Sequence, residues 1–374
     1  MKELFDIPYQ FRVNVLREKT EWRRSDEDTW QELDDRALNT IYFSLCQAGN
    51  KVNFKELERY LYSDFFPTYH PFHDYLNALP AWDGRDRVDA LARRVSNDEL
   101  WQQVFHRWMR AMVAQWMDHD MLTANSMVPV LVSRRQGLGK STFWRQLMPP
   151  ELAAYYLDKL DFTATGEYDR MMAQCGIINL DELNAFSDRA MAKFKAATQM
   201  KSITHHSTHT TRIAYCKRLA SFCATTNEVG ILHDYTGSRR FFCVNVQHKI
   251  NCSRPIDHAQ LYAQLVSEIH AGEPTWFCKN EERRIERHNA AFYRLTPLQH
   301  AILRHYHLPE EGEGQTCTAQ AMFNVVARHH PALLAGVRLA DFGRQVARLF
   351  PVANRRKEGR TYRAIPMTAQ NATL

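Results

Sequence analysis

The residues best suited to chemistry lie in the stretch LVSRRQGLGKSTFW, residues 131–144. Its end matches the phosphate-binding pattern Gly-x-x-x-x-Gly-Lys-[Ser/Thr], with Gly139, Lys140 and Ser141 in the last three places. The first glycine of the pattern is replaced by Arg134. A lysine and a hydroxyl at this spacing could hold the phosphates and the Mg²⁺ ion of a nucleotide. The alternative is a structural glycine turn before an amphipathic helix.

Phosphate binding at such a loop depends on backbone N–H groups that converge at the start of a helix. Lys140 would reach the β and γ phosphates, and the Ser141 hydroxyl would hold Mg²⁺. We expect nucleotide contacts from Gln136, Gly137, Leu138, Gly139, Lys140, Ser141 and Thr142.

A pair of carboxylates, Asp181 and Glu182, ends the stretch GIINLDE, and Asp181 lies 41 residues after Lys140. Asp181 is the predicted Mg²⁺ ligand together with Ser141, and Glu182 is the predicted base that polarises the attacking water. An apolar run that ends in Asp-Glu can also be a helix cap or a surface turn.

Two further patterns supply an amide and two guanidinium groups. Asn227 ends the run SFCATTN, where its amide could sense the γ-phosphate or orient the water. Arg239 and Arg240 follow a Gly-Ser turn, and guanidinium groups suit the charge of a phosphoryl transition state. A strand-end turn and a pair of surface arginines are the alternatives, but all four patterns in this order favour nucleotide hydrolysis.

The elements that must position these residues alternate along the chain. Buried strands are predicted at 126–133, 175–182, 219–227 and 239–246, with helices between them, which indicates an α/β domain with a mainly parallel sheet. A long helix is predicted over 97–119 with Asn97 as its N-cap. Its apolar stripe should be core: Trp101, Val104, Phe105, Trp108, Met112 and Trp116.

Three regions are expected. Residues 1–120 form a mainly helical N-terminal region, in which Asn53 caps one helix. Residues 121–290 form the core. Residues 291–374 show three short helices followed by a strand, a basic turn and a strand, which is typical of a winged-helix domain.

The composition is that of a soluble globular protein, with 24% charged and 45% hydrophobic residues and a formal charge of +6. Eight scattered cysteines without a CxxC pair indicate reduced thiols. Neither a signal peptide nor an apolar run of 18 residues is present, so we expect a cytoplasmic protein without a membrane segment.

The order QGLGKSTF, IINLDE, SFCATTN and DYTGSRRFFCV resembles the virulence-associated protein E (VapE) family. These P-loop proteins of prophages and phage satellites are related to superfamily 3 helicases and to the helicase part of viral primase-helicases. LPAWDGRDR, residues 79–87, resembles the segment ahead of the family's ATPase core. The resemblance covers roughly 70–270 and implies a P-loop NTPase (AAA+-like) core that uses ATP and Mg²⁺.

The resemblance also assigns roles position by position. Lys140 and Ser141 match the Walker A residues, Asp181 and Glu182 the Walker B pair, Asn227 the sensor, and Arg239 or Arg240 the arginine finger. Family members often have Gly-Pro-Gln-Gly where this chain has Arg134-Arg135-Gln136-Gly137. That difference puts the loop geometry and the turnover in question.

A basic stretch at 201–220 lies between the Walker B and sensor strands and contains no acidic residue. The resemblance implies a DNA-contacting hairpin in this interval, with Lys201, Arg212, Lys217 and Arg218 as its candidates. A solvated basic hairpin is the alternative. A second candidate surface for DNA is the basic turn at 355–363.

These patterns together predict a DNA-dependent ATPase, a superfamily 3-like helicase or replication-initiation motor of a prophage or phage satellite. Arginine fingers that act on a neighbour imply a ring, and we expect a homo-hexamer that works with a separate primase. Two rivals stay open: a non-hydrolysing module in which nucleotide or DNA binding drives assembly, and a defence ATPase that senses phage DNA.

Overall fold

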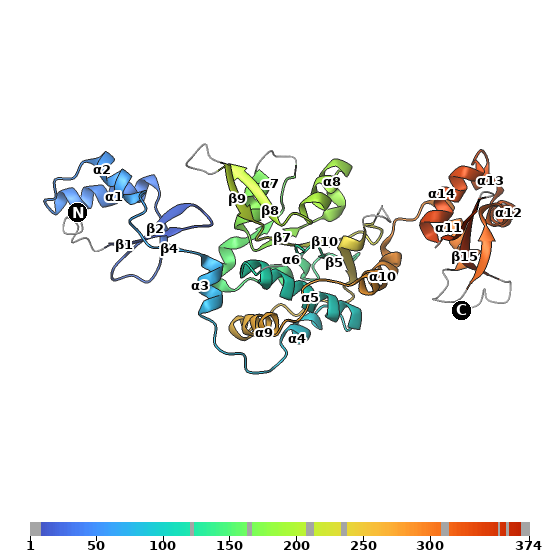
Figure 1. The fold of residues 1–374 in the computed structure, drawn as a ribbon, viewed down its shortest axis with the longest axis horizontal. Helices are drawn as coiled ribbons and strands as arrows, with labels where there is room; N and C mark the ends of the chain where they lie inside the picture. The colour runs from blue at the N-terminus through green and yellow to red at the C-terminus, as the bar shows by residue number, and fades with distance from the viewer. Residues whose placement is uncertain are drawn as a thin grey trace. The chain divides into compact units, whose positions relative to one another are not determined.

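The computed structural model describes residues 9–119, 123–162, 167–206, 213–232, 238–307, 314–350, 352–356 and 359–367 (Figure 1). The chain divides into two compact units. The first comprises Met1–Glu228 and Arg239–Asn289, and the second comprises Val229–Ser238 and Ala290–Leu374.

A five-stranded sheet lies at the centre of the first unit. Its order is β11 (Phe241–Asn245), β5 (Val128–Val132), β10 (Ser221–Thr226), β7 (Ile177–Leu180) and β6 (Tyr156–Asp158). Every neighbouring pair is parallel. The predicted parallel sheet is thus confirmed, although β6 was not predicted because its run is only three residues long. Since the strands share one direction, their carboxyl ends meet at one edge.

Helices cover both faces of this sheet: α5 (Glu99–Trp116), α6 (Lys140–Arg145) and α9 (His258–His270) on one, and α8 (Asp188–Ala197) on the other. The alternation of side chains in β11 illustrates the two layers. Phe242 stacks on Trp101 of α5 with ring centroids 6.2 Å apart. Phe241 lies 6.0 Å from Phe194 of α8.

The long helix α5 belongs to this core. Every residue of its predicted apolar stripe is at most 1% exposed, which confirms the stripe as core. Its N-cap is Asp98, not Asn97, because the Asp98 carboxylate accepts the backbone N–H of Leu100 at 2.8 Å. The predicted boundary at residue 120, between the N-terminal region and the core, therefore separates α5 from the sheet on which it packs.

The N-terminal region contains a sheet that the sequence did not predict, in the order β3-β2-β1-β4. Its elements are β1 (Tyr9–Asn14), β2 (Lys19–Arg24), β3 (Gln31–Glu32), α1 (Asp35–Gln47), α2 (Phe54–Leu61), β4 (Thr68–Tyr69), α3 (Pro71–Asn77) and α4 (Val88–Ala92). Asn53 caps α2 as predicted. One face of β1 and β2 packs Tyr9, Phe11 and Trp22 on the apolar core of this region, and the other face carries polar pairs, in which Arg12 Nη2 lies 2.8 Å from Glu21 Oε2.

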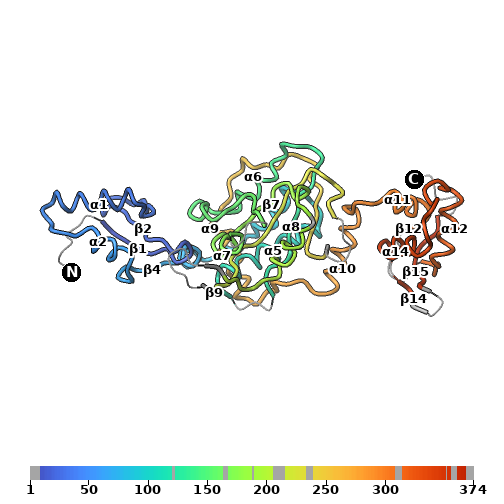
Figure 2. Tube along the Cα trace, turned by 90° about the horizontal axis from the view of Figure 1, so that it is seen from above, coloured from blue at the N-terminus to red at the C-terminus, as the bar shows by residue number. Residues whose placement is uncertain are grey.

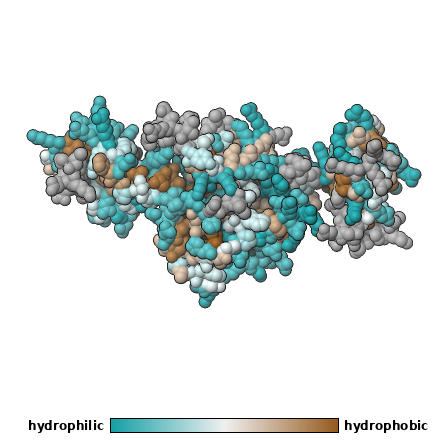
Figure 3. All heavy atoms as spheres, viewed as in Figure 1, coloured by the Kyte–Doolittle hydropathy of each residue, from teal (hydrophilic) through white to brown (hydrophobic). Residues whose placement is uncertain are grey.

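The remaining elements of the first unit are short. They are η2 (Pro150–Tyr155), α7 (Glu167–Gln174), η3 (Leu183–Ala185), the hairpin β8 (Ser202–His206) and β9 (Ile213–Lys217), η4 (Ser238–Arg240), α10 (Lys279–His288) and η5 (Asn289–Phe292). Of these, η4 begins in the second unit and η5 continues into it. Hydrophilic residues form most of the surface in Figure 3, with apolar residues in separate small areas. Within the described ranges, no helix is long and apolar enough to cross a bilayer.

The second unit has its own apolar core, which includes Ile302, Met322, Val326 and Phe342. Its elements are α11 (Pro297–Leu303), β12 (Tyr306–His307), β13 (Gln315–Thr318), α12 (Ala319–His329), α13 (Pro331–Leu334), α14 (Leu339–Leu349), β14 (Val352–Arg356) and β15 (Gly359–Pro366). Its strands pair in the order β12-β15-β13, with β14 paired to β15, and Figure 2 shows α11, α12 and α14 beside these strands. The expected order of three helices and a hairpin is present, while the winged-helix assignment stays a prediction.

Candidate nucleotide-binding site

A loop of residues 133–139 joins β5 to α6 at the carboxyl edge of the central sheet. Gly137 and Gly139 have φ angles of 73° and 84°, in the left-handed region that favours glycine. A Cβ atom on Gly139 would lie 3.2 Å from the Cys252 Sγ atom. Behind the loop, the Ile250 N–H donates to the Leu138 carbonyl at 2.9 Å. Glycine at 139 therefore serves both the turn and the close packing.

Lys140 is the first residue of α6, and its side chain is held at this edge. Its Nζ donates to Ser133 Oγ at 2.7 Å and to Asn227 Oδ1 at 2.8 Å. The residue is only 9% exposed. Burial lowers the pKa of Lys140, and the nearby Asp181 acts in the opposite direction. Both acceptors are neutral, so the ammonium group keeps its charge available for an anionic ligand.

Oxygen atoms from three elements meet at Asp181, directly after β7. Ser141 Oγ donates to Asp181 Oδ1 at 3.0 Å, and Thr225 Oγ1 of β10 donates to the same oxygen. Carboxylate and hydroxyl oxygens suit Mg²⁺. Within the described ranges, no cluster of three or more His, Cys, Asp or Glu side chains could hold a metal. A magnesium ion here would take its other ligands from phosphate and water.

Glu182 follows in an exposed turn at the same edge. Its φ angle of 56° is unusual for a residue other than glycine, and such strain is concentrated at functional sites. Asn184 connects this turn to the end of β10, because it accepts from Thr226 Oγ1 at 3.1 Å and donates to Glu228 Oε1 at 3.4 Å. The turn that carries Glu182 is thereby fixed to the end of β10, which Asn227 directly follows.

The rest of the predicted nucleotide set lies on the same segment. Gln136 and Thr142 are exposed, and Leu138 is half-buried. Sequence reasoning did not find Ser133 or Thr225, although both hydroxyls contact predicted residues. Thr225 lies two positions before Asn227, so the side-chain alternation of a strand would have placed both on one face.

Arg239 and Arg240 lie at the opposite end of the sheet. They form η4, which leads into β11, and Phe241 at the start of β11 pairs with Val128 at the start of β5. Five residues of strand span roughly 16 Å. The structure therefore does not bring these arginines together with Lys140 of the same chain. They line a cavity of about 370 Å³ that Trp276 also lines.

The predicted DNA-contacting residues do not form one set. Lys201 and Lys217 are exposed beside the hairpin β8–β9, but Arg218 is only 2% exposed. Burial takes Arg218 out of the DNA-contacting set, because its guanidinium lies among oxygens of the protein interior. Arg212 and part of the basic turn at 355–363 lie outside the described residues.

Comparisons with known proteins were made for the sequence and for the fold. Residues 76–294 match the sequence model of the virulence-associated protein E-like domain. No curated protein matched the chain.

Among solved structures, similar folds include three apo structures of the C-terminal region of NrS-1. Two have TM-scores of 0.49 and 0.46 at 12% and 10% identity, and cover 97% and 98% of this chain and 98% of theirs. The third has a TM-score of 0.40 at 12% identity and covers 76% of this chain and 65% of its own.

Proposed function

Since this chain belongs to the virulence-associated protein E-like domain family, we propose that it binds ATP with Mg²⁺ and hydrolyses the β–γ bond. The observation that carries the proposal is the arrangement at the carboxyl edge of the sheet. The ammonium group of Lys140, which has only neutral hydrogen-bond partners, lies there near the Asp181 carboxylate. That carboxylate accepts a hydrogen bond from the Ser141 hydroxyl.

The roles follow from the contacts. Lys140 would exchange the Ser133 and Asn227 oxygens for phosphate oxygens. Ser141 and Asp181 would hold Mg²⁺, which supplies charge neutralisation at the phosphates. Glu182 would accept the proton of the water that attacks the γ-phosphorus, as the bond to the leaving oxygen of ADP breaks.

A DNA-dependent motor requires that contact with a strand changes the nucleotide site. The exposed Lys217 ends β9, and four residues later β10 begins and runs to the edge that holds Asn227. Lys201 and Lys217 would contact backbone phosphates without reading sequence. We infer a helicase or replication-initiation motor of a prophage or phage satellite, working with a separate primase.

We infer a ring from the position of the two arginines. Arg239 and Arg240 lie at the amino end of the sheet, away from Lys140 of their own chain. They would reach phosphates in a neighbouring subunit, which makes each site composite and favours a closed ring, a homo-hexamer by the family resemblance.

A second candidate is a nucleotide-binding module that assembles on DNA without hydrolysis. Arg134, which stands where the pattern has its first glycine, favours it, because a changed loop can bind phosphates in a geometry that does not react.

ATP hydrolysis separates the two candidates. The chain should hydrolyse ATP, single-stranded DNA should increase the rate, and Lys140→Ala should lower it by about 10²- to 10³-fold. Lys55→Ala, at an exposed lysine of α2, is the matched control and should change nothing. Saturable ATP binding without hydrolysis would select the assembly module. A parental rate in Lys140→Ala would contradict the site assignment.

A further inference from the structure

The Asp181 carboxylate, the predicted Mg²⁺ ligand, accepts two hydrogen bonds, both at its Oδ1 atom. One comes from Ser141 Oγ at 3.0 Å, and the other comes from Thr225 Oγ1. An ionised carboxylate has no hydrogen to donate, so both hydroxyls must be the donors. Two donors at one oxygen restrict the rotation of this carboxylate before any ligand binds.

The two donors differ in what a bound ligand would do to them. Ser141 belongs to α6, directly after Lys140, and its oxygen is itself an expected ligand of Mg²⁺. Thr225 belongs to β10, is only 3% exposed and lies outside the nucleotide loop. Because the Thr225 hydroxyl is not an expected ligand, its hydrogen bond to Asp181 can persist when the site is occupied.

The central sheet brings Thr225 to this position. Ala224 pairs with Leu180 of β7. Thr225 and Asp181 are the next residues of these two chains and therefore lie side by side. On its other side, Thr225 pairs with Leu131 of β5. Threonine is stiff at χ1, so a buried threonine on a central strand presents its hydroxyl in a fixed direction.

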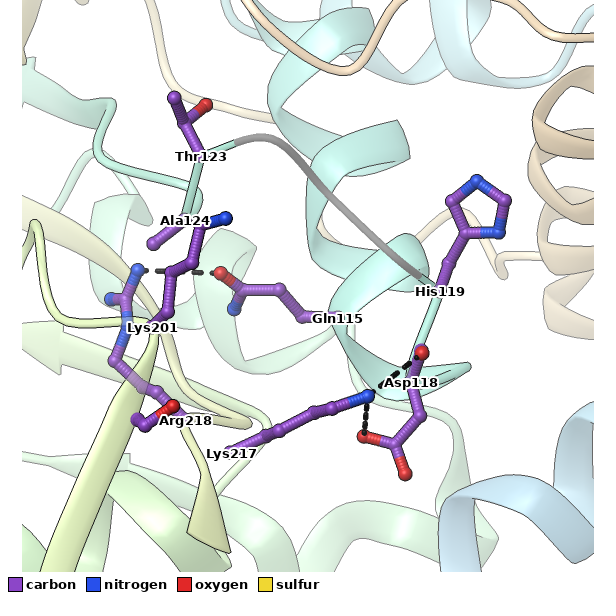
Figure 4. Close-up of a pocket in the computed structure, with 9 residues that line it drawn as sticks. Gln115, Asp118, His119, Thr123, Ala124, Lys201, Lys217 and Arg218 are labelled. Atoms are coloured by element: carbon purple, nitrogen blue, oxygen red, sulfur yellow. Dashed lines mark hydrogen bonds and ion pairs between the residues drawn. The ribbon is translucent and has the colours of Figure 1, made fainter.

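β10 is also held at its other end, by a buried polar network. Figure 4 shows the contact there in which Arg218 Nη2 donates to Gln115 Oε1 at 3.3 Å. The side-chain amides of Gln115 and Asn125 both donate to Ser221 Oγ, at 3.3 and 3.0 Å. Gln115, Asn125 and Ser221 are each at most 9% exposed. The strand that carries Thr225 is therefore firmly supported, as precise positioning of a functional group requires.

We propose that Thr225 is a positioning residue, whose hydroxyl orients the Asp181 carboxylate for a nucleotide-bound divalent cation. The inference rests on the proposed nucleotide-binding function. Hydrogen bonds to a ligating carboxylate fix its direction, and the loss of such a partner typically weakens metal binding about 10- to 100-fold. Valine has nearly the shape of threonine without the hydroxyl, so Thr225→Val isolates this hydrogen bond.

Metal affinity in the full-length chain tests the proposal, with Mn²⁺ as a paramagnetic substitute for Mg²⁺ and a non-hydrolysable ATP analogue as the nucleotide. Electron paramagnetic resonance follows the bound Mn²⁺. We expect Thr225→Val to raise the Kd for Mn²⁺ about tenfold or more, while the Kd for the analogue in EDTA stays within about twofold of the parent. Thr225→Ser, which keeps the hydroxyl, should bind Mn²⁺ like the parent.

Thr20→Val is the matched control. Thr20 is also buried, and its hydroxyl donates to the Leu61 carbonyl at 3.0 Å in the N-terminal region. This variant loses a hydrogen bond of a buried threonine outside the central sheet, so its Kd for Mn²⁺ should not change. If Thr225→Val does not fold, Thr225→Ser and Thr225→Ala replace it as a pair, because they differ by the hydroxyl alone.

The outcomes separate this inference from the proposed function. Metal-dependent binding of the analogue by the parent, with an unchanged Kd for Mn²⁺ in Thr225→Val, would overturn the role of Thr225 alone. An equal loss of affinity for Mn²⁺ and for the analogue in EDTA would also overturn it, because the effect would then be structural. A parent chain that binds no analogue would contradict the proposed function, on which the inference rests.

Discussion

The two ends of the central sheet hold their cations in different ways. At the carboxyl end, Lys140 contacts two neutral oxygens in loops that follow strands; burial lowers its pKa, and the nearby Asp181 offsets part of that effect. At the amino end, Arg218 is enclosed and contacts only uncharged acceptors. The charge of Lys140 lies at an open edge of the sheet, whereas the guanidinium of Arg218 holds the buried groups around it in place.

This difference has a topological cause. The loops that follow parallel strands all open at the carboxyl edge, so ligand groups from distant parts of the chain can meet there. At the amino end, Gln115 of α5 donates to the carbonyls of Leu219 and Ala220, just before β10 begins. Charges at that end are free to act only where they border a cavity or face another molecule.

The largest effect is expected for the arginines at the amino end. Arg239→Ala or Arg240→Ala should lower ATP hydrolysis by about 10³-fold, because a finger that stabilises the transition state is lost, while ATP binding persists. The matched control is Arg24→Ala, at an exposed arginine of β2.

Mixing experiments decide where these arginines act. An Arg239→Ala chain mixed with a Lys140→Ala chain should regain activity, since neighbours can form one intact composite site. If mixed assemblies form and stay inactive, the arginines do not act on a neighbouring subunit. Their position at the amino end of the sheet would then not support a composite site.

The next largest effect concerns Arg218 and stability. Arg218→Met should lower the free energy of unfolding of the first unit by about 3 kcal/mol or more, because oxygen acceptors that it now satisfies would stay buried without donors. All eight tryptophans belong to this unit, so urea unfolding followed by tryptophan fluorescence reports on it alone. The control is Arg24→Met. Equal stability of Arg218→Met and the parent would show that Arg218 does not organise the interior.

The smallest effect is expected at Arg134. Arg134→Gly should leave the Kd for ATP within about twofold of the parent, because Arg134 is exposed and lies before the residues expected to contact phosphates. Equilibrium titration with a fluorescent ATP analogue measures this. A large loss of affinity would show that Arg134 itself contacts the nucleotide.

The sheet could be predicted because four of its strands are continuous apolar runs, as expected for parallel strands buried on both faces. β6 gave no such run, since only three residues pair. β1 and β2 are six residues each, and only one face of them, which includes Phe11 and Trp22, packs on apolar side chains, so their alternation is a weak signal. In each case the run is too short for its periodicity to distinguish a strand from other structure.

The candidate site could be predicted where a residue belongs to a local pattern, as Lys140 and Asp181 do. Arg218 could not, since the residues that enclose it are distant in the sequence. Its partners Gln115 and Asn125 lie 103 and 93 positions away. In the sequence alone, an arginine without acidic neighbours indicates an exposed charge, and only tertiary contacts show that it is buried.

The most direct test of the account is hydrolysis and binding by Glu182→Gln, measured together on one preparation. The amide cannot accept a proton from water, but it leaves Lys140, Ser141 and Asp181 in place. We predict an ATP Kd within about threefold of the parent and a single-turnover rate lower by at least about 10²-fold. Hydrolysis at the parental rate would contradict the assignment of Glu182 and, with it, the proposed nucleotide site.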